Sequence, residues 1–164
     1  MLLYGIVTTK STNTMITFKQ IETYQAIREI FKHKKNWYLL HECIDNSKEV
    51  VEYGNEIFFD TDYDELYYIN EKDYLWIAGY DENKLCFLQF IHKPVRNRLE
   101  LVVAQKKTTV KSSNWFNGVV EYVKTMYPNL RSITTLPMND KLKEYYKSFG
   151  FADYKHGELK LKIK

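Results

Sequence analysis

Two hydrophobic patterns divide this chain into short segments of expected secondary structure. Alternating or β-branched hydrophobic runs favour strands, and hydrophobic residues at helical spacing favour amphipathic helices. The expected strands lie at 2–8, 74–80, 84–91, 98–104, 131–136 and 158–164. The expected helices lie at 17–34, 115–127 and 139–149. Strands and helices therefore alternate along most of the chain.

The first expected helix, 17–34, has a clear start signal. Thr17 and Gln20 have the spacing of a capping box, in which each side chain accepts a hydrogen bond from the other residue's backbone N–H. Ile16 and Ile21 stand at the two positions of a hydrophobic staple. We therefore expect this helix to begin at Thr17.

The stretch 36–73 has no firm assignment. Residues 37–44 favour a strand and residues 47–53 a short helix. Residues 63–69 are acidic and aromatic without a clean period. The pattern is sharp again only from residue 74 onward.

Turn and cap signals frame the remaining elements. The acidic turn 81–83 lies between two strand-like runs and predicts a β-hairpin. A polar loop, 105–113, precedes the second helix, which Pro128 ends because proline cannot continue a helix. Asn139 is a favoured N-cap for the last helix, and Gly150 permits the left-handed backbone that closes it.

The order of elements predicts one mixed α/β domain over residues 1–164. The sequence has no internal repeat, no low-complexity run and no linker rich in Pro, Gly or Ser. Strands joined partly by hairpins and partly by helices predict a mixed, mostly antiparallel twisted sheet flanked by helices.

Composition narrows the class of protein. Hydrophobic residues make up 45% and charged residues 27%, as in ordinary globular proteins, so disorder is excluded. Cys43 and Cys86 are too isolated to predict a disulfide framework or a zinc site. We expect a cytoplasmic protein, because no signal peptide and no long apolar span is present. Abundant Tyr, Lys, Asn and Ile are typical of low-GC coding and suit a bacterium or its phage. The histidines show no metal-ligand spacing: His33, His41, His92 and His156.

The net charge of +3 hides an asymmetry. Residues 1–97 carry a net charge of −4, and residues 98–164 carry +7. The acids concentrate in 41–82, which holds 13 of them. A basic surface attracts phosphates and an acidic one attracts amines. The alternative interpretation is two ordinary solvated faces.

The end of the chain resembles a known family. Residues 139–151 are similar to the C-terminal motif of GNAT acetyltransferases, N-x-x-A-x-x-[FL]-Y-x-x-x-G-F. Leu142 replaces the usual small residue, and Tyr145 occupies the apolar position. The order of elements over 98–136 also agrees, so the resemblance covers about 74–164. Four residues match the motif directly: Asn139, Tyr146, Gly150 and Phe151.

The resemblance implies a cofactor, acetyl-CoA, held between the strands at 98–104 and 131–136. The backbone of Leu101, Val102 and Val103 would then polarise the thioester carbonyl. Asn139 would cap its helix and offer its amide to the ligand.

Two side chains would carry out proton transfer. Tyr146, with Tyr145 as a substitute, would protonate the leaving thiolate. Glu100 is the candidate base that removes a proton from the amine, directly or through water. Each has a structural alternative: Glu100 as an exposed strand residue, and Tyr146 as a core aromatic.

The expected pyrophosphate loop departs from the family pattern [QR]-x-x-G-x-[GA]. Lys107 takes the Arg or Gln position, Val110 the first Gly and Ser112 the second. Glycines let the backbone approach phosphates closely, and Val110 does not. Ser112 and Ser113 offer hydroxyl donors instead, and Lys106, Lys107 and Lys111 offer charge. The loop is therefore either a modified anion site or the remnant of a lost one.

Two functions follow. The first is an N-acyltransferase that moves an acetyl group from acetyl-CoA to a primary amine of a small molecule or protein, cationic if the acidic segment attracts it. The alternative is an inactive GNAT-like binding or assembly module, viral or in a bacterial complex, whose opposite charges would favour a homo-oligomer. A third reading, nucleic-acid modification, rests only on the basic residues of 98–164.

Overall fold

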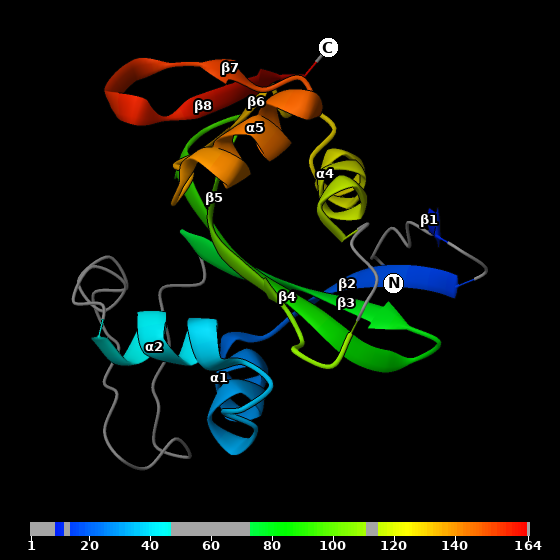
Figure 1. The fold of residues 1–164 in the computed structure, drawn as a ribbon. Helices are drawn as coiled ribbons and strands as arrows, with labels where there is room; N and C mark the ends of the chain where they lie inside the picture. Colours follow the sequence, from blue (N-terminus) through cyan, green and yellow to red (C-terminus); the bar gives the residue numbers. More distant parts are fainter. Residues whose placement is uncertain (1–8, 12–13, 47–72, 111–114, 164) are drawn as a thin grey trace.

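An eight-stranded sheet organises the protein, in the order β1-β2-β3-β4-β5-β6-β8-β7 (Figure 1). The structure is a computed structural model that describes residues 9–11, 14–46, 73–110 and 115–163. β5 and β6 are parallel, and every other neighbouring pair is antiparallel. The predicted mixed, mostly antiparallel sheet is therefore confirmed. The strands are β1 (Thr9–Ser11), β2 (Thr14–Ile21), β3 (Tyr74–Asp81), β4 (Lys84–Val95), β5 (Arg98–Lys106), β6 (Ser132–Thr135), β7 (Ala152–Asp153) and β8 (Leu159–Lys162).

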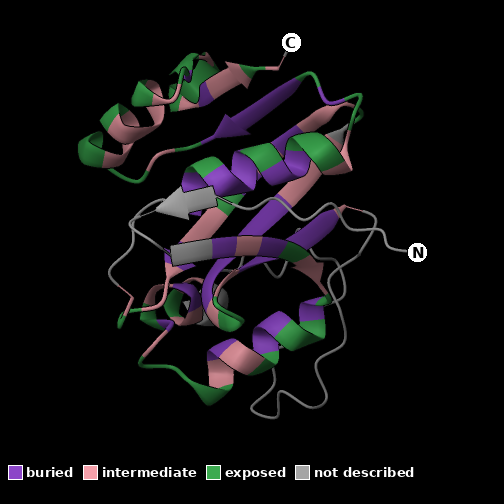
Figure 2. Ribbon diagram, turned by 90° about the vertical axis from the view of Figure 1, so that its right-hand side faces the viewer, coloured by how far each residue is buried: buried purple, intermediate pink, exposed green. Residues whose placement is uncertain are grey.

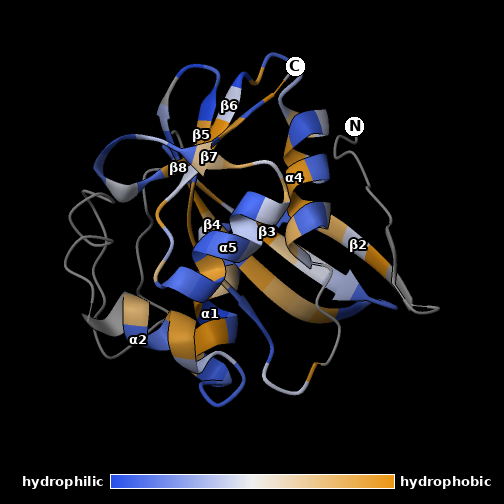
Figure 3. Cartoon of the chain, turned by 45° about the horizontal axis from the view of Figure 1, so that its top comes forward, coloured by the Kyte–Doolittle hydropathy of each residue, from blue (hydrophilic) through white to orange (hydrophobic). Residues whose placement is uncertain are grey.

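Helices cover both faces of the sheet. The α-helices are α1 (Thr23–Lys32), α2 (Tyr38–Asn46), α4 (Trp115–Met126) and α5 (Asp140–Ser148). One hydrophobic cluster joins α1 and α2 to the sheet, and a second joins α4 and α5 to its other face. α4 turns its buried side toward the sheet and its exposed, hydrophilic side outward (Figures 2 and 3).

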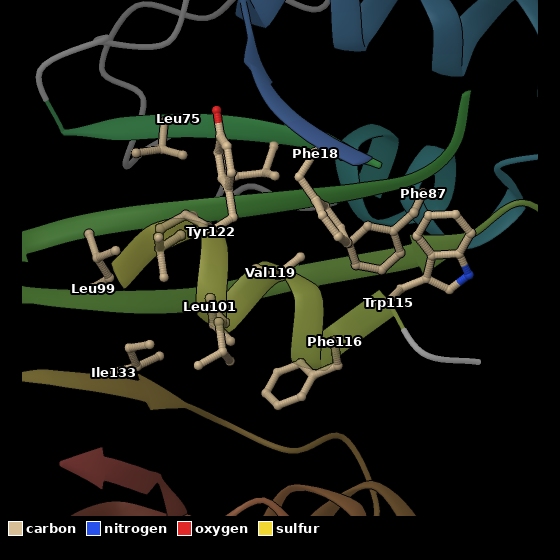
Figure 4. Packing of buried hydrophobic residues seen from close by; sticks show 14 of the residues in the cluster. Phe18, Leu75, Phe87, Leu99, Leu101, Trp115, Phe116, Val119, Tyr122 and Ile133 are labelled. Atoms are coloured by element: carbon tan, nitrogen blue, oxygen red, sulfur yellow. The ribbon is translucent and has the colours of Figure 1, made fainter. Parts of the chain in front are cut away.

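The cluster around α4 combines aliphatic side chains with a group of aromatic rings at the start of the helix (Figure 4). Trp115 of α4 stacks on Phe87 of β4, with ring centroids 5.7 Å apart. Phe18 of β2 meets both rings edge-on. Gly118 lies directly over Phe18, and a Cβ there would collide with that ring. This packing fixes the start of α4 against the centre of the sheet.

The helix expected at 17–34 is confirmed over Thr23–Lys32, as α1, but its expected start at Thr17 is wrong, because residues 14–21 form β2. This strand pairs with β3, from Ile16 opposite Asp81 to Ile21 opposite Trp76. Ile16 and Phe18 are buried on alternate positions, a period-two pattern that the cap-like spacing concealed. A different capping box exists five residues later, where Glu22 is the N-cap of α1 and exchanges hydrogen bonds with Gln25.

The strand expected at 37–44 is also wrong, because α2 occupies this segment. Its N-terminus is capped from far along the chain: Gln105 Oε1 accepts hydrogen bonds from the N–H groups of Leu39 and Leu40, at 2.9 and 3.1 Å. A cap supplied from β5 leaves no local signal. The expected strand 2–8, the expected helix 47–53 and the stretch 63–69 lie outside the described residues.

The C-terminal half agrees closely with the sequence prediction. The hairpin turn is present, with Glu82 and Asn83 in the left-handed region at φ 48° and 71°. Asn139 Oδ1 accepts a hydrogen bond from Leu142 N at 2.9 Å, which confirms the predicted cap. Gly150 has φ 98°, as its predicted role requires. β4 and β5 are longer than expected, and the short β7 was not predicted.

Candidate active site

A β-bulge lies in the middle of β5. Phe90 of β4 pairs with Val103, but the next residue, Ile91, pairs with Leu101, so Val102 has no pairing partner on β4. Leu101 and Ala104 consequently both pack on the α4 side although they are three residues apart. A bulge bends its strand and re-aims the side chains beside it.

A buried glutamine supports this bulge. Gln89 of β4 is 2% exposed, and its Nε2 donates to the carbonyl oxygens of Phe90 and Val103, at 3.0 and 3.1 Å. No role was predicted for Gln89 from the sequence. A glutamine inside the hydrophobic run 84–91 is the signal that could have found it, because buried amides are kept where they satisfy backbone groups.

β5 parts from β6 at the same level. Their parallel ladder ends where Leu101 pairs with Thr135. Thr135 Oγ1 donates to the carbonyl oxygen of Leu101 at 3.1 Å and closes the ladder. β5 continues to Lys106, and within the described chain no strand pairs with residues 102–106 on that side. This edge of β5 therefore offers backbone donors and acceptors to a ligand.

A cavity of about 260 Å³ occupies the space beyond the end of β6. Its walls come mainly from β5, from the segment after β6 and from the facing sides of α4 and α5. Leu136 and Met138 are more than 60% exposed at this cavity. Exposed apolar side chains beside a pocket are typical of a binding site. The cavity is lined by Leu39, Phe87, Val102, Val103, Ala104, Lys106, Trp115, Phe116, Thr135, Leu136, Pro137, Met138, Leu142, Tyr145 and Tyr146.

Tyr146 reaches the cavity from α5. Its ring meets Phe116 edge-on at 4.8 Å and lies 5.6 Å from Phe151. Burial raises the pKa of the Tyr146 hydroxyl, and a hydrogen bond with the Thr135 side chain lowers it in part. A tyrosine hydroxyl, whose ordinary pKa is about 10, is protonated at neutral pH, so Tyr146 can donate a proton at the cavity.

Glu100 lies two residues before the bulge and does not line the cavity. One of its carboxylate oxygens is 3.2 Å from Nδ1 of His92 on the neighbouring strand. His92 stacks on Tyr74 with ring centroids 4.6 Å apart. Both members of the pair remain partly exposed, at 23% for the His92 side chain and 32% for that of Glu100. The histidine therefore holds the carboxylate in place while water still reaches it.

Of the predicted backbone contacts, Val102 and Val103 line the cavity. Leu101 points into the core, and its carbonyl oxygen is taken by Thr135. Asn139 does not line the cavity, and its Oδ1 is engaged in the helix cap. The structure thus brings two of the three predicted β5 residues to the site.

The loop after β5 is anchored toward α2. Lys107 Nζ lies 5.9 Å from the centre of the Trp37 ring, and its amide donates to Cys86 O at 2.7 Å. Thr108 bonds the carbonyl oxygens of Asn36 and Lys35. Lys107 therefore faces α2, whereas Lys106 lines the cavity. Lys111, Ser112 and Ser113 lie outside the described residues.

Within the described residues, no group of three or more His, Cys, Asp or Glu side chains is close enough to hold a metal ion. No helix in the described part is long and apolar enough to cross a membrane.

Solved acetyltransferases have the same arrangement. PaiA N-acetyltransferase from Thermoplasma acidophilum, in complex with coenzyme A, has a TM-score of 0.54 at 14% identity, over 91% of this chain and 98% of that one. The GNAT domain of S. lividans PAT has a TM-score of 0.56 at 12% identity, over 91% of each chain. An acetyltransferase from Thermus thermophilus has a TM-score of 0.57 at 9% identity, over 89% of this chain and 97% of that one.

These comparisons establish the fold class. The chain has the fold of the GNAT acetyltransferases, and the fold expected from its C-terminal motif is confirmed. No protein-family model and no curated protein matches the sequence itself. Because all three identities are low, the likeness concerns the fold alone.

Proposed function

We propose that this protein is an N-acyltransferase that transfers an acetyl group from acetyl-CoA to a primary amine. The observation that carries this proposal is the cavity beside the bulge, which combines an unpaired strand edge with a protonated tyrosine. An unpaired edge supplies alternating N–H and C=O groups, and Tyr146 supplies an acid. Both are what acyl transfer from a thioester requires.

The cavity fits the pantetheine arm of coenzyme A. That arm is a slender chain with two amides, and the β5 edge at residues 102–106 offers complementary backbone groups in a largely apolar slot. Lys106 would add a cation at the slot. When bound, acetyl-CoA would supply the activated acetyl carbonyl. The phosphate-binding role of Lys111, Ser112 and Ser113 is part of the proposal.

The chain's own residues would then handle the protons. A bond forms between the amine nitrogen and the acetyl carbon, and the carbon–sulfur bond breaks. The backbone beside the bulge, at Val102 and Val103, would stabilise charge on the carbonyl oxygen. Glu100, held by His92, would accept the amine proton through water. Tyr146 would give its proton to the departing sulfur.

Turnover tests this proposal. Free thiol is measured during incubation of the protein with acetyl-CoA and a set of primary amines, including a polyamine and a lysine peptide. We expect at least one amine to accelerate thiol release. If none does and acetyl-CoA does not bind, the fold serves a non-catalytic role, and the search should turn to binding partners.

Tyr146→Phe should lower the turnover number about 100-fold, since a positioned general acid contributes on the order of 10²-fold or more. Acetyl-CoA affinity should stay nearly unchanged, because the ring is kept. Tyr145→Phe is the matched control: it lines the same cavity and removes the same atom. Equal activity of Tyr146→Phe and the unmodified protein would remove Tyr146 from the mechanism.

A further inference from the structure

A second hollow region lies at the other end of β5. It consists of two adjoining cavities of about 520 and 680 Å³, which share the turn between β4 and β5 and the segment after α4. Six cationic side chains line them: Lys93, Arg96, Arg98, Arg131, Lys160 and Lys162. We call this region the basic hollow. Among the described residues that line it, none is an aspartate or a glutamate.

The cations come from separate parts of the chain. Arg96 and Arg98 flank the left-handed turn residue Asn97, whose φ is 66°. The backbone N–H of Arg131 donates to the carbonyl oxygen of Asn97 at 2.8 Å, which fixes the start of β6 beside this turn. Lys162 of β8 pairs with Ser132 of β6. The fold thus gathers charges that the sequence spreads over 98–164 and its upstream turn.

Three of these cations are exposed and take part in none of the ion pairs found in the described part of the chain: Arg96, Arg131 and Lys162. Arg98 Nε is buried and finds no hydrogen-bond partner among the described groups. A buried guanidinium donor without an acceptor is costly, and Arg98 itself lines the hollow, so the described fold leaves part of its hydrogen-bonding capacity unused beside this cavity.

We propose that the basic hollow binds the phosphodiester backbone of a nucleic acid. Two adjoining cavities with cations on several sides suit a chain of repeated negative charges better than a single phosphate. Three of the six cations are arginines, which recognise phosphate with two parallel hydrogen bonds. Asn129 and Tyr127 also line the hollow and offer an amide and an aromatic ring. Such groups commonly accompany backbone contacts in nucleic-acid sites.

The basic hollow is distinct from the cavity of Tyr146. Arg98 begins β5, whereas Val102 stands at the bulge four residues later, about 13 Å along an extended strand. None of the described residues lines both the hollow and that cavity. The inference therefore does not rest on acyl transfer, and each activity can fail alone.

Helix α4 gives a competing reason for cations here. Its C-terminal residue, Met126, lines the hollow, and the carbonyls of a helix C-terminus favour positive charge without any ligand. On that account the cations stabilise the fold, and the hollow does not bind nucleic acid. Neutralising the cations would then lower the melting temperature without changing any binding. The two accounts differ in a measurable way.

Fluorescence anisotropy with a labelled RNA strand of about 20 nucleotides, and with its duplex, tests the proposal. If all six cations engage the strand, the salt slope should be about −4.2, so affinity should fall about 300-fold between about 50 and 200 mM salt. Arg96→Gln/Arg131→Gln should reduce that slope by about 1.4 and weaken binding evenly across sequences.

Lys34→Gln/Lys84→Gln is the matched control. Both lysines are exposed and lie outside the hollow, and the two substitutions remove the same amount of positive charge as the arginine substitutions. Melting temperatures of both variants verify that they fold. The proposal is overturned if neither RNA form binds at about 50 mM salt. It is equally overturned if both variants weaken binding alike, or if only anionic lipid vesicles bind through Arg96 and Arg131.

Discussion

Glu100 is the residue whose proposed role depends most on a neighbour. Its carboxylate is 3.2 Å from His92 Nδ1 and remains partly exposed. If it receives the amine proton, Glu100→Gln should lower turnover about 100-fold at saturating acetyl-CoA, because the amide cannot accept that proton. His92→Asn should have a smaller effect, since it removes only the positioning.

The control for this pair is acetyl-CoA affinity, which both variants should leave unchanged because neither residue lines the cavity. A more basic amine, which carries its proton more tightly, should suffer the larger loss in Glu100→Gln. Full activity of that variant with every amine would make Glu100 a strand residue without a part in proton transfer.

Partly buried tyrosines predict a loss of stability in alkali. Burial raises the pKa values of four hydroxyls above the usual value of 10: Tyr80, Tyr127, Tyr145 and Tyr146. A raised pKa in the folded state means that the native protein holds the proton more tightly than the unfolded chain. Their contribution is complete below about pH 10 and is lost as pH rises through the folded-state values.

Urea unfolding between about pH 8 and 11 measures this effect. The free energy of unfolding should fall in the upper part of that range, and it should fall less steeply in Tyr146→Phe, which has no hydroxyl to ionise. An identical slope in the variant and in the unmodified protein would show that Tyr146 ionises as readily when folded as when unfolded.

At the scale of elements, Gln105 joins β5 to α2. Its side chain is 7% exposed and accepts from the first free N–H groups of the helix. Gln105→Leu would leave these donors without a partner, at a cost of about 1–3 kcal/mol. For a domain of this size, we expect the melting temperature to fall by roughly 2–4 °C for each kcal/mol lost.

Comparison of Gln105→Glu with Gln105→Leu separates the contribution of the cap hydrogen bonds to stability from that of side-chain packing. A carboxylate still accepts the two N–H groups, and negative charge is favourable at a helix N-terminus, so this variant should recover most of the loss. It gives up the weak donation from Nε2 to Asn36 O at 3.4 Å. Equal melting temperatures for the two variants would mean that the hydrogen bonds to α2 contribute nothing measurable.

At the scale of the whole molecule, local signals predicted the C-terminal half well. Asn139 and Gly150 lie at the two ends of α5 and predicted its bounds, and both have the predicted geometry. In the N-terminal half, the predictions were wrong at segments whose secondary structure is determined by non-local contacts. β2 is a strand because it pairs with β3, and α2 is a helix capped by Gln105, 65 residues away from Leu40. Tertiary context overrode the propensity of both segments.

The sequence motif predicted which helix contributes to the candidate site, but not the shape of the site. The motif around Tyr146 predicted an acid on the last helix, and that side chain lines the cavity; its role as an acid stays a prediction. The bulge at Val102 and the end of the β6 ladder arise from pairing between strands, which single-sequence patterns do not encode. The residues that sequence analysis missed, among them Ala104 and Phe116, line the cavity only because of this geometry.

Calorimetric titration of the protein with acetyl-CoA tests the central claim that the cavity beside β5 holds the cofactor. Ala104 lines this cavity, so the larger side chain of Ala104→Leu should fill part of it. We expect the dissociation constant for acetyl-CoA to rise at least about tenfold, or about 1.4 kcal/mol. Ala152→Leu makes the same change on exposed β7 and should bind like the unmodified protein. Absence of binding to the unmodified protein, or equal affinity in all three proteins, would contradict the account.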